Sequence, residues 1–230
     1  FLTESRFDNR ENRTRFLKGN FNAATRLAGG TLVKLNMSLS DVEREQYLVS
    51  RRLPAAPGAR SHEETFAENF DTPGMEIGLD AERGLNPHLL GKAIVLFNYA
   101  DEASYKTHRV FNDTGTLSGF RLAEGSAAST EVITRLEFDW TGLSGHLLQL
   151  NLEGAFNSLD GSLEQVVDTG AGPVTVDVPG ANSHVKEIRW DVLLQDTLTR
   201  GPFELDLGLG AEATTLTQTG DADQNRNFFY

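Results

Sequence analysis

The chain has 230 residues, of which 21 are basic and 33 acidic, giving a formal net charge of −12. This acidic balance argues against a nucleic-acid groove, which needs Lys and Arg along the phosphates. The chain contains no cysteine, which excludes disulfides and cysteine-bound zinc. No apolar run reaches the roughly 18 residues of a spanning helix, although membrane β-strands give no such signal.

Apolar and polar residues alternate with a period of two, which is typical of β-strands, in eight stretches. In chain order they cover about 17–28, 31–44, 74–84, 89–105, 130–141, 146–157, 184–199 and 203–215. The last is the most regular: odd-numbered residues from Phe203 to Ala213 are apolar, whereas Glu204, Asp206 and Glu212 occupy the other parity. One segment, "LSDVEREQYLVSRR" (39–52), has a spacing that also allows a short helix.

The connections alternate in length. Tight turns are predicted at Gly29-Gly30 and at 85–88, 141–146 and 199–202, where Gly, Pro and Asn supply the backbone angles of hairpins. Long polar loops are predicted near 45–73, 106–129 and 158–183. Short turns on one rim and long loops on the other indicate an antiparallel up-and-down meander of about eight long strands.

Alternation alone also fits a soluble β-sandwich or a lipocalin-like barrel. However, the predicted strands are about 11–16 residues long, whereas globular strands cluster near 5–6 and membrane strands need about 9–11. Aromatic residues stand near the ends of the apolar bands: Trp140 and Phe203 beside short turns, and Tyr99 and Phe156 toward the long loops. These features favour part of a transmembrane β-barrel, with lipid outside.

The polar parity is rich in carboxylates. It carries Glu76, Asp80, Glu82, Glu137, Asp139, Glu153, Glu187, Asp191, Glu204, Asp206 and Glu212, against Arg26, Lys34, Lys92, Arg135 and Arg189. A packed eight-stranded barrel would bury this surplus of acids at a cost of several kcal/mol each. The sequence therefore predicts a wide, water-filled lumen, with Glu204, Asp206 and Glu212 pointing inward.

The stretch "HLLQLNLEGAFNSLDGSLEQ" and the segment from "VPGANSH" to "TLTQTGDADQNRNFFY" resemble the barrel region of TonB-dependent outer-membrane receptors. The resemblance covers most of the chain and is strongest over about 130–230. It implies a barrel of 22 strands with an N-terminal plug. It also implies outer-membrane lipid, the TonB complex (through the plug) and a scarce small-molecule ligand such as an iron–siderophore as partners, in a Gram-negative outer membrane.

Neither a plug nor a TonB box is visible in the sequence, so residues 1–230 are expected to form one partial barrel domain. The chain begins at Phe1 without a signal segment, which suggests an internal fragment. It ends in an aromatic residue, but the preceding "GDADQNRN" is too polar for a closing strand that faces lipid. Truncation within a longer barrel is the expectation.

No catalytic, cofactor-binding or metal-binding residue is predicted, and the protein is not expected to be an enzyme. The five histidines (His62, His88, His108, His146 and His184) lack metal-ligand spacing, and no hydrolase elbow or phosphate loop is present. Two other functions stay open: a passive porin or small outer-membrane barrel, and a soluble β-sandwich binding module. The sequence does not identify the ligand.

Overall fold

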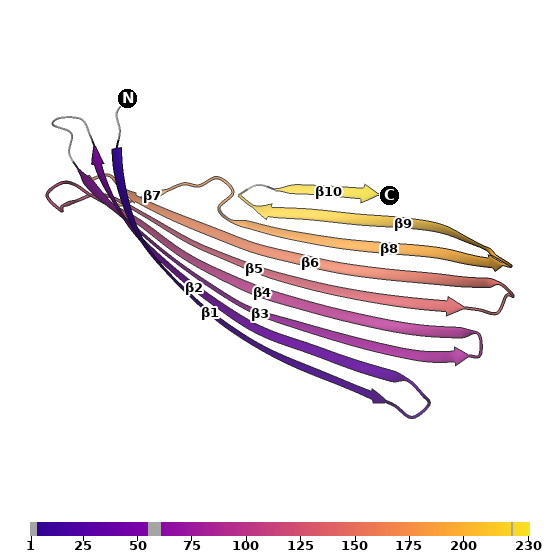
Figure 1. Ribbon diagram of the computed structural model, residues 1–230. Helices are drawn as coiled ribbons and strands as arrows, with labels where there is room; N and C mark the ends of the chain where they lie inside the picture. The colour runs from indigo at the N-terminus through magenta and orange to yellow at the C-terminus, as the bar shows by residue number, and fades with distance from the viewer. Residues whose placement is uncertain (1–3, 55–60, 222) are drawn as a thin grey trace.

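The computed structural model describes residues 4–54, 61–221 and 223–230, which form a single antiparallel sheet (Figure 1). The strands are β1 (Glu4–Arg26), β2 (Leu32–Pro54), β3 (His62–Asn86), β4 (Leu89–Phe111), β5 (Leu117–Trp140), β6 (His146–Asp168), β7 (Val174–Val176), β8 (Ser183–Arg200), β9 (Phe203–Gly220) and β10 (Gln224–Phe229). Each strand pairs with the next along the chain, except that β7 pairs with β6 beside the β6–β8 pair.

This order confirms the predicted all-β, up-and-down meander. The strands number ten rather than about eight, because β7 has only three residues and β10 six. The aromatic end of the chain does return to the sheet, since β10 pairs with β9 from Gln224 to Phe229. Across the described ranges no helix is long and apolar enough to cross a membrane.

The four predicted tight turns are present and lie along one rim of the sheet (Figure 1). Gly29 and Gly30 have φ values of 91° and 85°, a region that residues with a Cβ rarely adopt. Only two residues separate β3 from β4, and two separate β8 from β9, where Gly201 has φ 61°. We call this edge the short-turn rim and the opposite edge the loop rim.

The predicted long loops are wrong over most of their length. The eight main strands run for 18 to 25 residues, so 45–54 and 62–73, 106–111 and 117–129, and 158–168 all belong to strands. On the loop rim, β4 and β5 are joined by residues 112–116 alone, and β6 and β8 by 169–182 with β7 inside; residues 55–60 lie outside the described part. These segments were not predicted as strands because apolar and polar residues no longer alternate in them once the strands leave the apolar band.

The helix considered for 39–52 is also wrong, because this segment is the middle of β2. Its alternate acids pair across to β1: Glu43 accepts a hydrogen bond from Arg15 at 2.8 Å, and Glu45 lies 3.5 Å from the Arg13 guanidinium. Alternate acids of a segment that also allowed a helix thus form a cross-strand ladder of ion pairs. The long-range pairing decides the conformation, and the local pattern does not.

The two faces of the sheet differ in chemistry. Cross-strand partners share a face, so the pairing of Leu209 with Leu194, and of Leu194 with Leu150, extends one apolar surface over several strands. The odd residues of β9 lie on it and are largely uncovered: Phe203 is 77% exposed, Leu207 59% and Leu209 75%. No second sheet covers this face within the described residues. The predicted parity is confirmed.

The apolar face forms a band of defined height. On β4 it runs over alternate residues from Leu89 to Tyr99, eleven residues or about 36 Å along the strand, which a tilt near 45° reduces to about 25 Å. Trp140 and Phe203 lie at its short-turn side, and Tyr99 and Phe156 toward the loop rim. This height matches the hydrocarbon layer of an outer membrane.

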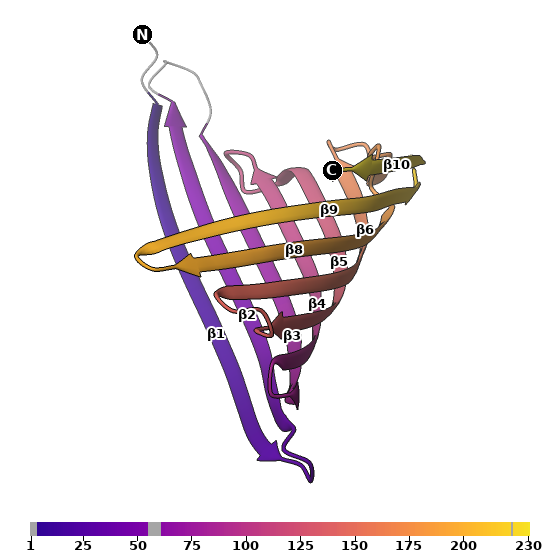
Figure 2. The ribbon, with the colours of Figure 1, turned by 90° about the vertical axis from the view of Figure 1, so that its right-hand side faces the viewer.

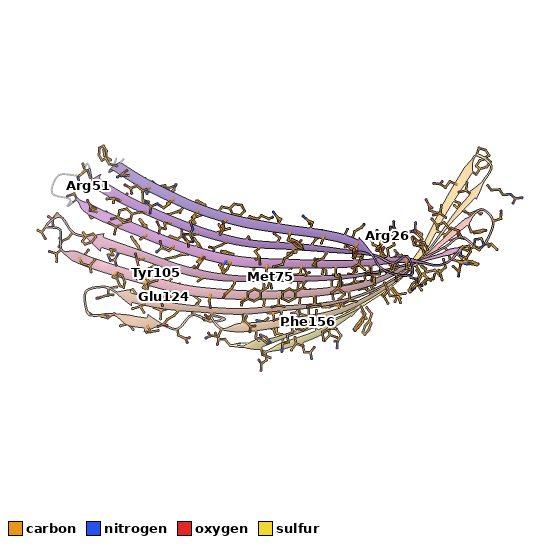
Figure 3. All side chains as sticks on the ribbon, turned by 90° about the horizontal axis from the view of Figure 1, so that it is seen from below. Arg26, Arg51, Met75, Tyr105, Glu124 and Phe156 are labelled. Carbon is orange, nitrogen blue, oxygen red and sulfur yellow. The ribbon has the colours of Figure 1, made fainter. Side chains whose placement is uncertain are left out.

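The sheet is strongly twisted and curved, so that β8 and β9 cross the direction of β1 in Figure 2. Figure 3 shows the side chains standing on both faces, with Arg26 near the short-turn rim, Met75 and Phe156 midway, and Arg51 near the loop rim. The sheet is open: β1 pairs only with β2, and β9 from Phe203 to Ala211 only with β8, among the residues described. Its shape is that of a barrel wall that does not close on itself.

Candidate functional site: the concave wall

The polar face is the concave face. A depression of about 580 Å³ on it is lined by residues from eight strands, from Lys18 on β1 to Leu216 on β9. Most of the lining residues belong to the parity that carries Glu204 and Glu212 on β9. Strands as far apart in the sheet as β1 and β9 can line the same depression only on the side toward which the sheet curves. The predicted inward-facing acids therefore line a lumen-like wall.

Within the height of the apolar band, acids far outnumber bases on this wall. Cross-strand pairing places on it the eleven predicted acids together with Glu131, against the five predicted cations Arg26, Lys34, Lys92, Arg135 and Arg189 and one more, Arg226 on β10. Twelve carboxylates against six cations leave a balance of −6 for this region. Glu131 was missed because the parity of 130–141 was assigned from residue 132 onward.

A three-residue ion network holds the centre of the wall. Glu153 accepts hydrogen bonds from Arg135 Nε at 2.7 Å and from Arg189 at 2.8 Å, and its side chain is only 10% exposed. Arg189 also contacts Asp191 at 2.9 Å, and Lys92 contacts Glu137 at 3.3 Å. Three of the cations in the band, Lys92, Arg135 and Arg189, are therefore neutralised by acids on neighbouring strands, and the acids left without such a partner carry the excess charge.

One transverse row of the wall alternates acid and amide. Register places Glu76, Asn98, Glu131, Asn157 and Glu187 side by side on β3, β4, β5, β6 and β8. The Asn98 amide donates to Glu131 at 2.7 Å, and the Asn157 amide to Glu187 at 3.1 Å. All five residues border the 580 Å³ depression. The row presents hydrogen-bond acceptors to the water that fills the concave side.

Nearer the loop rim, a buried carboxylate is surrounded by one arginine and two histidines from three strands. Glu64, with a side chain 11% exposed, lies 3.3 Å from Arg52, 3.2 Å from His62 and 3.7 Å from His108, whose ring stacks on Phe66 at 4.1 Å. Beside this group, a hydrogen bond from Arg6 and a second from Ser50 hold the pKa of the Asp8 carboxyl below its ordinary value. This part of the wall is tied together by charge.

The remaining histidines have local partners. His146 contacts Asp196 at 2.8 Å on the outer face near the short-turn rim, and His184 contacts Asp160 on the same face toward the loop rim. His88 lies in the β3–β4 turn, where its backbone N–H donates to Asn86. No cluster of three or more potential metal ligands is found in the ranges that the structure describes. That the protein is not an enzyme stays a prediction.

Comparison with known proteins gave no match to a family model and none to a curated protein sequence. Solved structures do match. The ferric-catecholate import receptor Fiu from E. coli K12 aligns with 96% of this chain at 11% identity and a TM-score of 0.51. The ferric preacinetobactin receptor BauA from Acinetobacter baumannii aligns with 97% at 12% identity and a TM-score of 0.47, and FpvA from P. aeruginosa with 99% at 8% and 0.44.

The match to Fiu, at such low identity, shows the fold alone: this chain has the architecture of an outer-membrane barrel wall. The chain spans 46% of the Fiu chain, 43% of BauA and 38% of FpvA. The class of protein that the fold defines is therefore a transmembrane β-barrel.

Proposed function

We propose that this chain is a wall segment of a larger outer-membrane barrel that serves a TonB-dependent receptor in the uptake of a scarce ligand such as an iron–siderophore. The short-turn rim faces the periplasm and the loop rim faces the cell exterior in this proposal. The whole of residues 1–230 forms one partial barrel domain. A plug supplied by the rest of the protein gates the lumen and connects it to TonB.

The observation that supports this proposal most strongly is that one face of the sheet carries an uncovered apolar band and the other face is an acid-rich concave wall. Large apolar side chains that remain half exposed or more need lipid rather than water. The unpaired edges at β1 and β9 support further strands on both sides, because barrels close to remove such edges. The share of Fiu that the chain covers supports the same conclusion.

Specific features distinguish the proposed receptor from the two alternative functions. A β-sandwich module needs the apolar face packed on another sheet, and the exposure of Leu205, Leu207 and Leu209 argues against it. A passive porin or small barrel shares the band and the wet wall. Sequence upstream of Phe1 separates it from a receptor: a plug-sized domain of about 150 residues favours the receptor, and a signal peptide alone favours the small barrel.

Cysteine labelling tests the membrane topology. The chain contains no cysteine, so single variants of the full-length protein in native outer membranes give an unambiguous readout. We expect Leu205→Cys, Leu207→Cys and Leu209→Cys to react only with a membrane-soluble maleimide. Glu204→Cys, Asp206→Cys and Glu212→Cys should be shielded from lipid and react with a small aqueous maleimide once the lumen is accessible. Equal aqueous labelling of both parities would exclude the membrane proposal.

Uptake needs its own experiment. In an iron-limited strain that expresses the full-length protein, growth on a supplied siderophore should depend on both the receptor and TonB. A passive porin would retain uptake when TonB is deleted, so growth without TonB would reject the receptor while leaving the barrel topology intact.

A further inference from the structure

The net charge of the concave face changes from negative to positive along the strands, from the apolar band toward the loop rim. Between the row of Lys18 and the row of Arg6, pairing places seven cations and four acids on this face. The cations are Arg6, Arg10, Lys18, Arg44, Arg52, Lys106 and Arg121, and the acids are Asp8, Glu64, Glu68 and Glu102. The balance is +3, above a region whose balance is −6. In a chain of net charge −12, this cationic zone is a local exception.

Some cations of the cationic zone form ion pairs with acids of the same zone. Arg6 pairs with Asp8 at 2.8 Å, Arg52 with Glu64 at 3.3 Å, and Lys106 with Glu68 at 2.7 Å. In contrast, Arg10, Lys18, Arg44 and Arg121 form no ion pair with any carboxylate of the described residues, and all four are exposed. We call these four residues the open cations. They come from β1, β2 and β5 and face the same concavity.

The geometry suits a ligand with more than one negative group. Arg10 and Arg44 lie on neighbouring strands, four positions apart in register, which puts their Cα atoms about 14 Å apart. Long guanidinium side chains from both reach one ligand of a few hundred daltons, and guanidinium groups bind carboxylate or phosphate oxygens in bidentate fashion. Arg121, on β5, contributes positive potential from the other side of the concavity.

We propose that the open cations form an electrostatic capture surface for a polyanionic small molecule, carrying carboxylate or phosphate groups, at the mouth of the lumen. The proposal rests on the proposed function, because it takes this face as the lumen wall. The acid-rich region beneath is less favourable for the same ligand, so the anion binds first at the loop rim. Attraction at the mouth raises the local ligand concentration and the association rate, and salt weakens both.

Binding of a trianionic fluorescent dye, pyrene trisulfonate, tests this in the full-length protein reconstituted in nanodiscs. Fluorescence anisotropy at about 20 mM salt should show binding that falls sharply by about 500 mM, where the Debye length shrinks to a few ångströms. Displacement by citrate identifies a carboxylate site and displacement by pyrophosphate a phosphate site; either result supports the proposal. Displacement by the polycation spermidine but by neither anion would overturn it.

Charge-matched variants locate the surface. Arg44→Gln with Arg121→Gln removes two open cations, whereas Arg13→Gln with Arg51→Gln removes two arginines from the outer face of β1 and β2. We expect the first pair to weaken dye binding about tenfold at low salt, roughly threefold for each exposed charge, and the second to change it less than twofold.

Equal losses in both pairs would show that net charge alone matters and would overturn the proposal, as would an unchanged affinity in the first pair. Neither result touches the labelling pattern of β9. If the even-numbered residues of β9 were labelled from lipid while dye binding stayed intact, the membrane topology would be rejected. The anion site would then lie on a soluble sheet. The two failures are therefore distinguishable.

Discussion

Single residues on the concave wall show how charge is held within a narrow strip of sheet. Glu153 is nearly covered, and its two oxygens receive hydrogen bonds from guanidinium groups on the strands to either side. Glu204, by contrast, lies exposed on β9 and makes no ion pair in the described part of the chain. The same residue type is thus a cross-link in one place and a solvated charge in the other.

Removing the Glu153 charge tests the cross-link. Glu153→Gln leaves Arg135 and Arg189 facing each other with a neutral group between them, so we expect a loss of about 1–3 kcal/mol in unfolding free energy. Urea unfolding of the lipid-reconstituted protein measures it. Glu204→Gln is the matched control and should fall within about 0.5 kcal/mol of the parent. Equal effects of the two substitutions would contradict a structural role for the network.

The Asp8 carboxyl makes a pH-dependent contact at the loop rim. Its pKa lies below the ordinary value of an aspartate, first because Arg6 donates a hydrogen bond to it and second because Ser50 does. A lowered folded-state pKa means that the stabilisation is complete above the unfolded value and is lost as the pH falls through the folded value. Carbon-13 NMR should show Asp8 titrating below its ordinary midpoint. The midpoint should rise in Arg6→Gln; an unchanged midpoint would refute the assignment.

At the scale of the strand, the sequence located the membrane-height part of each element but not its full extent. Alternation predicted 31–44 and 89–105 well, because apolar residues recur on one parity inside the band. Above the band, water meets both faces, and residues such as Glu43 and Asp71 replace leucines on the outer parity. The periodic signal vanishes there while the backbone pairing continues.

The cation-bearing residues of the loop rim were missed for the same reason. Arg10 and Arg121 lie in segments that lack apolar alternation, and Arg121 falls within a predicted loop. Arg44 lies at the very end of the alternating stretch 31–44, where that stretch overlaps the supposed helix. In contrast, the acids of the lumen wall were predicted because most of them, such as Glu76, Glu137 and Asp206, stand between two apolar neighbours. No signal in the sequence placed the open cations on one face, since that needs the register of β1, β2 and β5.

An ion-pair swap tests whether β2 remains paired to β1 beyond the band. Arg15→Glu opposes two acids, Asp41 and Glu43, across the β1–β2 pair and should increase amide hydrogen exchange at 41–49. Adding Glu43→Arg should restore part of the protection, by an amount of at most about 1 kcal/mol that salt reduces. Exchange in 41–49 that is fast in the parent protein would show that the strand ends at the band.

For the whole molecule, the open sheet and its uncovered band determine solution behaviour. Phe203 and Leu209 are more than half exposed together with many other large apolar residues of the same face. Their combined surface exceeds what monomeric soluble proteins expose, and the free edges of β1 and β9 offer hydrogen bonds to other chains.

We therefore expect this 230-residue chain, expressed alone, to aggregate in buffer and to disperse only with detergent. Sedimentation velocity with and without a mild detergent measures this directly. Substituting Leu205, Leu207 and Leu209 by serine should reduce the detergent requirement, whereas serine at Glu204, Asp206 and Gly208 should not. A sharp monomer peak from the parent chain in plain buffer would rule out a membrane wall.

The imbalance of twelve acids to six bases at membrane height bears on ion permeation. Fixed negative charge along a wide aqueous path enriches mobile cations and depletes chloride. A closed barrel in which every segment resembled this one, stripped of its gate and placed in a planar bilayer under a KCl gradient, would conduct potassium in preference to chloride. The sign of its reversal potential would report the charge of the pore lining.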